Sequence, residues 1–274
     1  MSKQLRRRAL LHLFLAAFGL LMLMPFGWMI STSLKDFGSV FLYPPRWIPD
    51  PVEWGNYPKA FSAFPFTRYF LNTSIVTVCR VLGPLLTASM GAYAFARLGF
   101  PGRDAIFLLY LATLMVPFHV VMIPLFVIMK KFGWLDSYAA LIVPGIFTAF
   151  GTFLLRQSFL TVPESLEEAA FIDGATPWQI YIQIILPISK PALATLSVLT
   201  FIGSWNDFLW PLIVLNRSEM LTLTLGLVSF QGFYFTEWNL LMAGAVIVLT
   251  PTVIIYLLAQ RYIVEGIAMT GLKY

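Results

Sequence analysis

Four carboxylates gather in one polar segment of an otherwise apolar chain. The segment lies between Arg156 and Lys190 and contains no basic residue. Its carboxylates are Glu164, Glu167, Glu168 and Asp173. Spacings of i, i+3 and i+4 place the three glutamates on one helical face, with Leu166, Ala169 and Ala170 toward the other side. Helices on anionic lipid carry basic residues, so this segment favours docking on a soluble protein that offers an apolar groove and a nearby Arg or Lys.

Helix start and stop signals organise the first half of this segment. Thr161 and Glu164 have the spacing of a capping box, and Pro163 suits a first helical turn. The helix is expected to run through about Asp173 and to stop at Gly174, which tolerates a left-handed conformation. An ordinary solvated connector is the alternative, but capped helices and an internal glycine fit it poorly.

The start signal is repeated directly afterwards. Thr176 and Gln179 again have capping-box spacing, and the second helix is expected to reach Leu186 and to be ended by Pro187. The loop over 157–187 is therefore predicted to be a helix–turn–helix that lies across the inner face of the membrane.

A second polar group lies inside apolar runs. It comprises Arg80 and the consecutive residues Trp205, Asn206 and Asp207. Charges within a membrane are costly and usually face protein or water, so these residues are candidates for a solute pathway. Trp offers a ring face for C–H groups, while Asn and Asp offer acceptors for hydroxyls, a combination that suits sugar. A helix-packing cluster or an interfacial aromatic belt is the alternative.

Other chemistries find little support in the sequence. His12 and His119 are the only histidines and Cys79 is the only cysteine, so a convergent catalytic set, a disulfide and a Cys-rich metal site are not expected. The chain has no GxxxxGK[ST] phosphate-binding loop, so ATP and its Mg²⁺ would have to be bound by another polypeptide. The net charge of +5 comes from dispersed residues and does not indicate nucleic acid.

Composition indicates an all-α polytopic membrane protein. The 274 residues are 59% hydrophobic and 11% charged, whereas a soluble domain averages about 25% charged residues. Prolines inside several apolar runs predict kinked helices around a pathway. Six runs are long enough to span a bilayer, and they cover about 9–31, 71–96, 104–129, 138–156, 188–215 and 239–262.

Basic residues predict the orientation of these spans. The cluster over 3–8 precedes the first apolar run and favours a cytoplasmic N-terminus. A cleaved secretory signal is the alternative, but the run over 9–30 is too long for a typical one. Six spans then place both termini, the 97–103 turn and the 157–187 loop in the cytoplasm.

The longest outer loop covers 32–68 and is rich in proline and tryptophan. Its aromatic side chains could form a belt at the lipid headgroups or could contact an external partner.

The polar segment that begins after Arg156, together with the residues just beyond it, resembles the EAA signature of ABC-importer permeases. The matching residues are Glu168-Ala169-Ala170, Asp173-Gly174-Ala175, Ile184, Leu186-Pro187 and Pro191. Flanking motifs are similar to the second permease subunit of carbohydrate importers of the maltose and glycerol-3-phosphate type. These motifs are Phe159-Leu160-Thr161-Val162-Pro163, Asn72-Thr73-Ser74, Ala92-Tyr93-Ala94-Phe95-Ala96-Arg97, Phe100-Pro101-Gly102, Trp205-Asn206, Trp210-Pro211-Leu212 and Gln260-Arg261-Tyr262-Ile263-Val264-Glu265-Gly266. The resemblance covers nearly the whole chain.

The resemblance implies one permease domain over 1–274 with six transmembrane helices, the type I ABC-importer fold and a cytoplasmic coupling helix. It implies that Glu168 pairs with a basic residue of the ATPase, that Ala169 and Ala170 occupy the ATPase cleft, and that Gly174 makes the turn. The expected docking residues are Glu164, Glu167, Glu168, Ala169, Ala170, Asp173 and Gly174. The family's C-terminal tail can also reach the ATPase dimer, although the tail here, 264–274, is short.

The same resemblance implies the partners. They are a sister permease, two ATPase subunits and an extracytoplasmic solute-binding protein, assembled in the lipid of a prokaryotic cytoplasmic membrane. The expected cargo is a sugar or sugar derivative. An ABC importer for another solute is the main alternative. A secondary transporter is less consistent, because Asp207 is the only clear intramembrane carboxylate.

Overall fold

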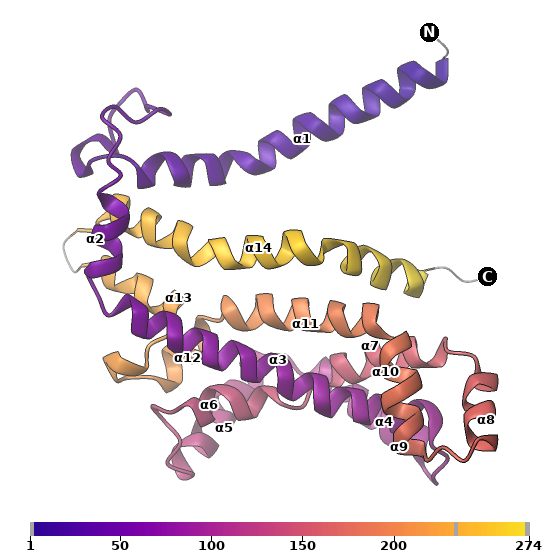
Figure 1. Ribbon diagram of the computed structural model, residues 1–274. Coiled ribbons are helices and arrows are strands. Elements are labelled where there is room, and N and C mark those ends of the chain that lie inside the picture. Colours follow the sequence, from indigo (N-terminus) through magenta and orange to yellow (C-terminus); the bar gives the residue numbers. More distant parts are fainter. Residues whose placement is uncertain (1–2, 233–234, 272–274) are drawn as a thin grey trace. The chain divides into compact units, whose positions relative to one another are not determined.

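The computed structural model describes residues 3–232 and 235–271, where helices are joined by turns and loops and the β structure is one isolated bridge between Gln231 and Thr236 (Figure 1). The expectation of an all-α fold is confirmed. The chain forms two compact units: Met1–Phe66 with Gly226–Thr250, and Thr67–Leu225 with Pro251–Tyr274.

The first unit contains α1 (Lys3–Ser33), η1 (Phe37–Ser39), α2 (Asn56–Ser62), η6 (Leu227–Phe230) and the first part of α14 (Trp238–Gly271). Buried Asn56 ties α2 to the end of α1, because its Nδ2 donates to the carbonyl oxygens of Ser33 and Lys35. Ala60, Phe230 and Ala243 pack together as a small core.

The second unit is built on α3 (Phe66–Arg97), an unbroken helix of 32 residues. Around it lie α4 (Arg103–Ala112), η2 (Thr113–Met115), α5 (Phe118–Lys131), α6 (Tyr138–Ile142), η3 (Val143–Gly145) and α7 (Ala149–Leu160). These are followed by α8 (Glu164–Ile172), α9 (Pro177–Ile180), η4 (Tyr181–Ile185), α10 (Leu186–Ile188), α11 (Lys190–Trp205), α12 (Leu209–Val214), η5 (Ser218–Met220) and α13 (Leu223–Gly226).

Three helices of the described residues are long and apolar enough to cross a membrane: Arg7–Ser33, Phe66–Arg97 and Trp238–Arg261. Three further spans are reached when each bent helix pair counts as one, so the six-span expectation is met only with broken spans. The pairs are Arg103–Met115 with Phe118–Lys131, Tyr138–Gly145 with Ala149–Leu160, and Pro177–Ile188 with Lys190–Trp205, bent by 97°, 41° and 76°.

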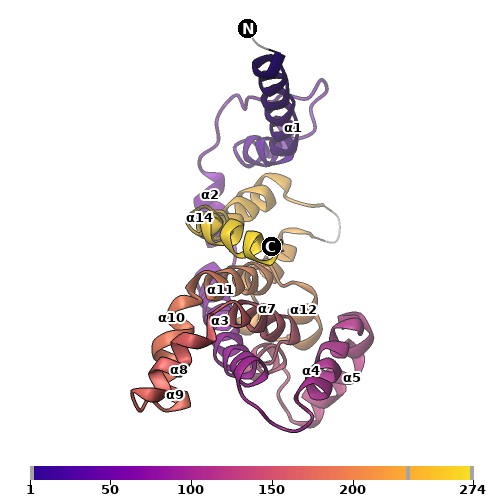
Figure 2. The same cartoon turned by 90° about the vertical axis from the view of Figure 1, so that its right-hand side faces the viewer.

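The sharpest bend corrects the expectation of one continuous helix over 104–129. Figure 2 shows α4 and α5 meeting at this bend. Val116 adopts an extended conformation, with φ −89° and ψ 112°. Pro117 explains it, because a proline ring disfavours the α conformation of the residue before it and supplies no N–H to the preceding turn.

The expected span over 188–215 is also interrupted. Its helix α11 ends at Trp205, and α12 begins only at Leu209. The backbone of residues 206–208 therefore leaves the helix at the place where the sequence concentrates its polar side chains.

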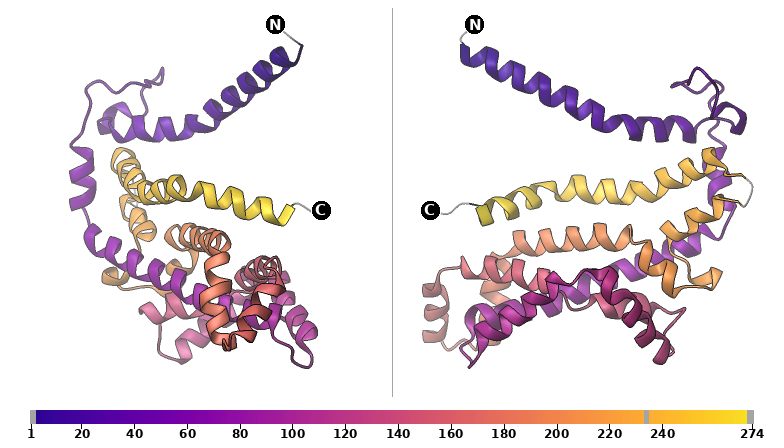
Figure 3. Two further views of the ribbon diagram at one scale, coloured as in Figure 1. Left: turned by 45° about the vertical axis from the view of Figure 1, so that its right-hand side comes forward. Right: turned by 180° about the vertical axis from the view of Figure 1, so that it is seen from behind.

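Small residues allow close packing at the centre of the second unit. Ala88, Ala92 and Ala96 recur every four residues on α3 and belong to one buried cluster. Gly151 of α7 is equally constrained, because a Cβ there would lie 3.2 Å from both Ala88 Cβ and Leu196 Cδ1. This packing holds α3, α7 and α11 together. Figure 3 shows α8 to α10 grouped at the end of this unit where α3 finishes.

Candidate functional site

The docking segment, residues 164–188, folds as a helix–turn–helix. Helix α8 ends at Ile172, and Gly174 takes a positive φ of 85°. The N–H of Gly174 donates to Phe171 O and that of Ala175 to Ala170 O, at 3.0 and 2.9 Å. This pair of bonds is a Schellman motif, which needs a left-handed residue at this place and so favours glycine. The expected stop at Gly174 is confirmed.

Only one of the two expected capping boxes forms. Thr176 Oγ1 accepts from the N–H of Gln179, and Gln179 Oε1 accepts from the N–H of Thr176, at 3.3 and 2.7 Å. The box expected at Thr161 is wrong: the Thr161 hydroxyl donates to Ser158 O, and α8 starts after Pro163 without a side-chain cap. Thr161 has helical φ and ψ angles that continue α7, so its hydroxyl points back to that helix.

The second helix also differs from its expected end. Pro187 does not stop it, because the helical chain continues through Ile188 and bends by 76° before Lys190. A π-helical stretch, Tyr181–Ile185, precedes the proline, and Pro187 then lies in the first turn of α10. A π-helical stretch and a proline are both recognised causes of a helix bend, so the chain bends here and does not stop.

A buried arginine braces the docking segment to α3. Arg97 is the last residue of α3, and its Nη2 donates to Phe159 O at 2.8 Å and to Val162 O at 2.5 Å. Its Nε lies 2.6 Å from Glu167 Oε1, with side-chain exposures of 6% for Arg97 and 10% for Glu167. Burial raises the pKa of the Glu167 carboxyl, while the Arg97 charge acts in the opposite direction. The end of α7 and the start of α8 are thereby fixed to the end of α3.

This brace changes the role expected for the acidic face. Glu167 is buried against Arg97 of its own chain and adds little to the exposed surface, so its place on the docking surface stays a prediction. Glu164 Oε1 lies 3.6 Å from Arg97 Nη1, but the Glu164 side chain is 82% exposed. Glu168 and Asp173 are exposed as well. The sequence spacing could not separate these glutamates, because Arg97 is distant in sequence.

Apolar side chains complete the exposed surface of the segment. Leu166 and Ala169 are exposed, while Ala170 packs against the core and is only partly accessible. Ile172, at 86% exposure, and Trp178 also face outward. Sequence reasoning missed these last two residues, although large apolar side chains in a polar loop were the available signal.

The second polar group assembles a charge pair inside the spans. Arg80 Nη1 lies 2.6 Å from Asp207 Oδ2, so α3 is linked to the break between α11 and α12. Gly145 makes room for the guanidinium, since a Cβ there would lie 3.0 Å from Arg80 Nε. Beside the pair is an open recess of about 290 Å³, called here the span recess. It is lined by Arg80, Pro84, Gly145, Phe147, Thr148, Thr200, Gly203 and Ser204.

Trp205 and Asn206, two of the expected pathway residues, lie outside the span recess. Trp205 is buried, with its ring against Phe70 and Phe201. Asn206 Nδ2 donates to Ile202 O and, at 3.4 Å, to Thr252 Oγ1. Neither residue lines the span recess. Sequence reasoning missed Phe147, Thr200 and Ser204, because isolated hydroxyls and one aromatic ring in apolar runs give no distinctive signal.

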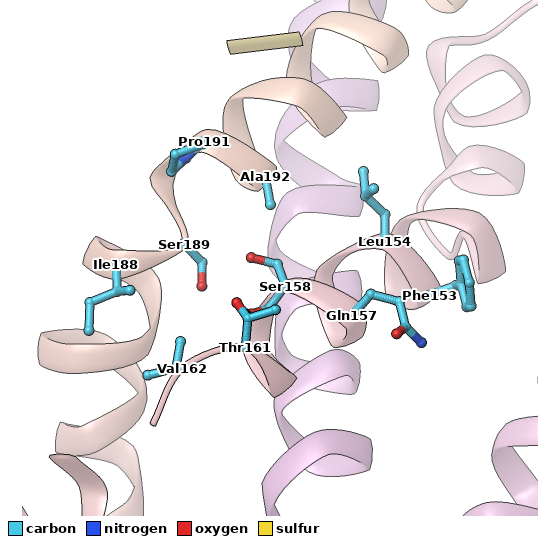
Figure 4. Close-up of a pocket in the computed structure, with 10 residues that line it drawn as sticks. All are labelled: Phe153, Leu154, Gln157, Ser158, Thr161, Val162, Ile188, Ser189, Pro191 and Ala192. Atoms are coloured by element: carbon cyan, nitrogen blue, oxygen red, sulfur yellow. The ribbon is translucent and has the colours of Figure 1, made fainter. Parts of the chain in front are cut away.

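A further pocket of about 310 Å³ lies where α7 ends beside the bend before Lys190 (Figure 4). The hydroxyls of Ser158, Thr161 and Ser189 point into it, and its lining carries no charged side chain. Its walls are Phe153, Leu154, Gln157, Ser158, Thr161, Val162, Ile188, Ser189, Pro191 and Ala192.

Comparison with known proteins identifies the family to which this chain is similar. Residues 84–268 match the model of a family described as the inner membrane component of binding-protein-dependent transport systems. The chain belongs to this family. The match includes the docking segment, Arg97 and Asp207, whereas Arg80 lies just before it. The resemblance inferred from the EAA-type segment is confirmed, and the protein is a multi-pass membrane component.

Relatives of this family member are similar along most of their length. The arabinooligosaccharides transport system permease protein AraQ of Halalkalibacterium halodurans is 36% identical over 261 residues, covering 95% of this chain and 92% of AraQ. The sn-glycerol-3-phosphate transport system permease protein UgpE of Yersinia pestis bv. Antiqua is 36% identical over 247 residues, covering 87% of each chain.

A solved structure is similar as well. A chain in the crystal structure of a bacterial ABC transporter involved in the import of the acidic polysaccharide alginate superposes with a TM-score of 0.85 at 26% identity. The match covers 96% of this chain and 98% of that chain. The expectation of an ABC-importer permease fold is therefore confirmed.

Proposed function

We propose that this chain is a permease subunit of an ABC importer for a sugar or sugar derivative. The observation that carries the proposal is the docking segment, a capped helix–turn–helix that exposes Glu168 and apolar side chains while Arg97 braces it to a span. Family membership supports the transport role. The names of AraQ and UgpE, with the alginate importer, support the cargo class.

The docking segment is proposed to bind an ATPase subunit. Glu168 would pair with a basic residue, the backbone around Ala169 would approach closely, and Ile172 and Trp178 would fill an apolar cleft. Desolvated apolar anchors surrounded by charges are the usual composition of a binding hot spot. ATP and Mg²⁺ belong to the ATPase, and this chain contributes the surface that responds to its closure.

Transport then follows from rigid connection. When the ATPase subunits close, they would carry α8 with them, and the bonds of Arg97 would pass this movement to the end of α3. The spans would change between inward-open and outward-open states. An external binding protein would shift that equilibrium by its differential affinity for the two states.

The proposed assembly contains this chain, a sister permease, two ATPase subunits and an extracytoplasmic solute-binding protein. The description of the family as binding-protein-dependent supports the last of these. The basic cluster over 3–8 supports a cytoplasmic N-terminus. With an even number of spans, the C-terminus and the docking segment would lie on the same side, where ATP is available.

The test is gentle purification of the chain from its native membrane, followed by mass spectrometry of the proteins that accompany it. A P-loop ATPase, a second six-span permease and a sugar-binding protein are expected. The sugars released from that binding protein would define the cargo. Recovery of the chain alone, in a detergent shown to preserve a known importer complex, would overturn the proposal.

A further inference from the structure

Ser204 provides an unused hydroxyl inside the span recess. Its residue is 7% exposed, and its Oγ has no hydrogen-bond partner among the described residues. Buried hydroxyls are normally satisfied by protein or by water, so an unpaired one beside a cavity points to a bound molecule. Ser204 belongs to α11, whereas Arg80 approaches the same recess from α3.

Arg80 also retains binding capacity. A guanidinium carries five N–H donors, and within the described chain the only oxygen that it bonds is Asp207 Oδ2. Its side chain is 24% exposed, and it lines the span recess. Guanidinium donors therefore face the recess, and Asp207, which does not line it, balances their charge. This arrangement can bind the hydroxyls of a diol without favouring a charged ligand.

The depth of the recess suits a solute in transit. Arg80 lies 14 residues after Phe66 and 17 before Arg97 on one helix. At a rise of about 1.5 Å per residue, it is about 21 and 26 Å from these ends, near the middle of a bilayer about 30 Å thick. A charge pair at this depth is tolerated when it faces protein or water.

We propose that the span recess contacts an uncharged, polyhydroxylated solute, a neutral sugar, and that Asp207 keeps the recess selective by balancing the charge of Arg80. The remaining donors of Arg80 and the hydroxyl of Ser204 would bind sugar hydroxyls, and the exposed ring of Phe147 would cover a C–H face. The proposal rests on the transport function for the arrival of the solute, but it assigns this subunit a direct contact with the cargo. A purely structural charge pair is the competing explanation.

The single cysteine of the chain makes a direct test possible. Ser204→Cys in a Cys79→Ala background would be assembled with its partners in nanodiscs and treated with neutral, cationic and anionic methanethiosulfonates. The thiol introduced at position 204 is expected to react at least tenfold faster than one introduced by Ser89→Cys, since Ser89 is buried and bonded to Tyr181. Ser165→Cys, at an exposed position, gives the upper limit. No reaction above the Ser89 variant would overturn the proposal.

Protection and charge selectivity then test the ligand class. Arabinotriose, a neutral sugar, is expected to slow modification of the Ser204→Cys thiol severalfold, while trigalacturonate, an acidic one, leaves it unchanged. Adding Asp207→Asn should raise the ratio of anionic to cationic reagent rates about tenfold and allow protection by trigalacturonate. If trigalacturonate slows modification of the thiol equally with and without Asp207→Asn, or if neither sugar slows it, the Arg80–Asp207 pair is purely structural. These rates need no ATP hydrolysis, so they can fail while the copurification test succeeds, and the reverse.

Discussion

Two arginines of α3, 17 residues apart, form ion pairs of the same length and have different surroundings. Arg97 Nε and Arg80 Nη1 each lie 2.6 Å from a carboxylate oxygen. Arg97 also donates to two carbonyls and is 6% exposed, whereas Arg80 bonds one oxygen of the described chain, is 24% exposed and borders the span recess. Separation alone does not distinguish a structural pair from one that can bind a ligand. The bonds to backbone carbonyls, the exposure of the side chain and the adjoining space differ between the two arginines.

The largest effect is expected from Arg97→Ala. Removing one partner of a buried pair leaves Glu167 uncompensated and costs about 3–5 kcal/mol. It also removes the contact of α3 with Glu167 in the docking segment and the two bonds to the end of α7 just before it. The purified complex should lose thermal stability, and ATP-driven uptake in proteoliposomes should fall below a tenth of the wild-type rate.

The matched control for that change is Arg103→Ala. The Arg103 side chain donates to the exposed Asp104, and such surface pairs contribute about 0–1 kcal/mol. If both variants lose the same stability and uptake, Arg97 has no special role in bracing the segment.

A change at the exposed face should separate coupling from folding. Glu168→Lys reverses a charge that no contact within the described chain requires, so the amount of protein in the membrane should stay unchanged. Substrate-stimulated ATP hydrolysis and uptake should both fall about tenfold, the equivalent of about 1.4 kcal/mol of lost docking affinity. Ser165→Lys, an exposed neighbour on α8, is the control. Wild-type uptake by Glu168→Lys would remove Glu168 from the docking surface.

A double-mutant cycle would examine the other pair. Arg80→Gln and Asp207→Asn each leave an unpaired charge within the spans, whereas the double variant leaves none. The double variant should therefore be more stable than the sum of the single losses predicts, by about 0.5–3 kcal/mol. Thermal unfolding of the four complexes measures this energy. Strict additivity would mean that the two side chains do not interact in the assembled protein.

Local sequence signals predicted local structure well. The helix stop at Gly174 and the capping box at Thr176 depend on residues within four positions, and both form. Other local signals were wrong: the capping box at Thr161 does not form, and Pro187 does not stop its helix. What no local signal could show is which side chains meet across helices. Glu167 is buried against Arg97, 70 positions earlier, and the recess beside Arg80 depends on hydroxyls of α11. Spacing along one helix carries no information about which face another helix will cover.

The smallest effect is expected from Glu167→Gln, and it tests whether the buried pair stabilises the fold through its charge. Burial holds the pKa of Glu167 above its usual value, so the folded state binds this proton more tightly than the unfolded state. Its contribution to stability is complete below the usual Glu pKa and is lost as pH rises through the raised value. Gln keeps a hydrogen-bond acceptor for Arg97 without the ionised charge. The variant should therefore match the wild type in acid and equal or exceed it near neutral pH, because the ionised carboxyl is the form that burial disfavours. Thermal unfolding against pH measures the difference. If the wild type instead gains stability over Glu167→Gln as pH rises, the attraction between the two charges holds α8 to α3.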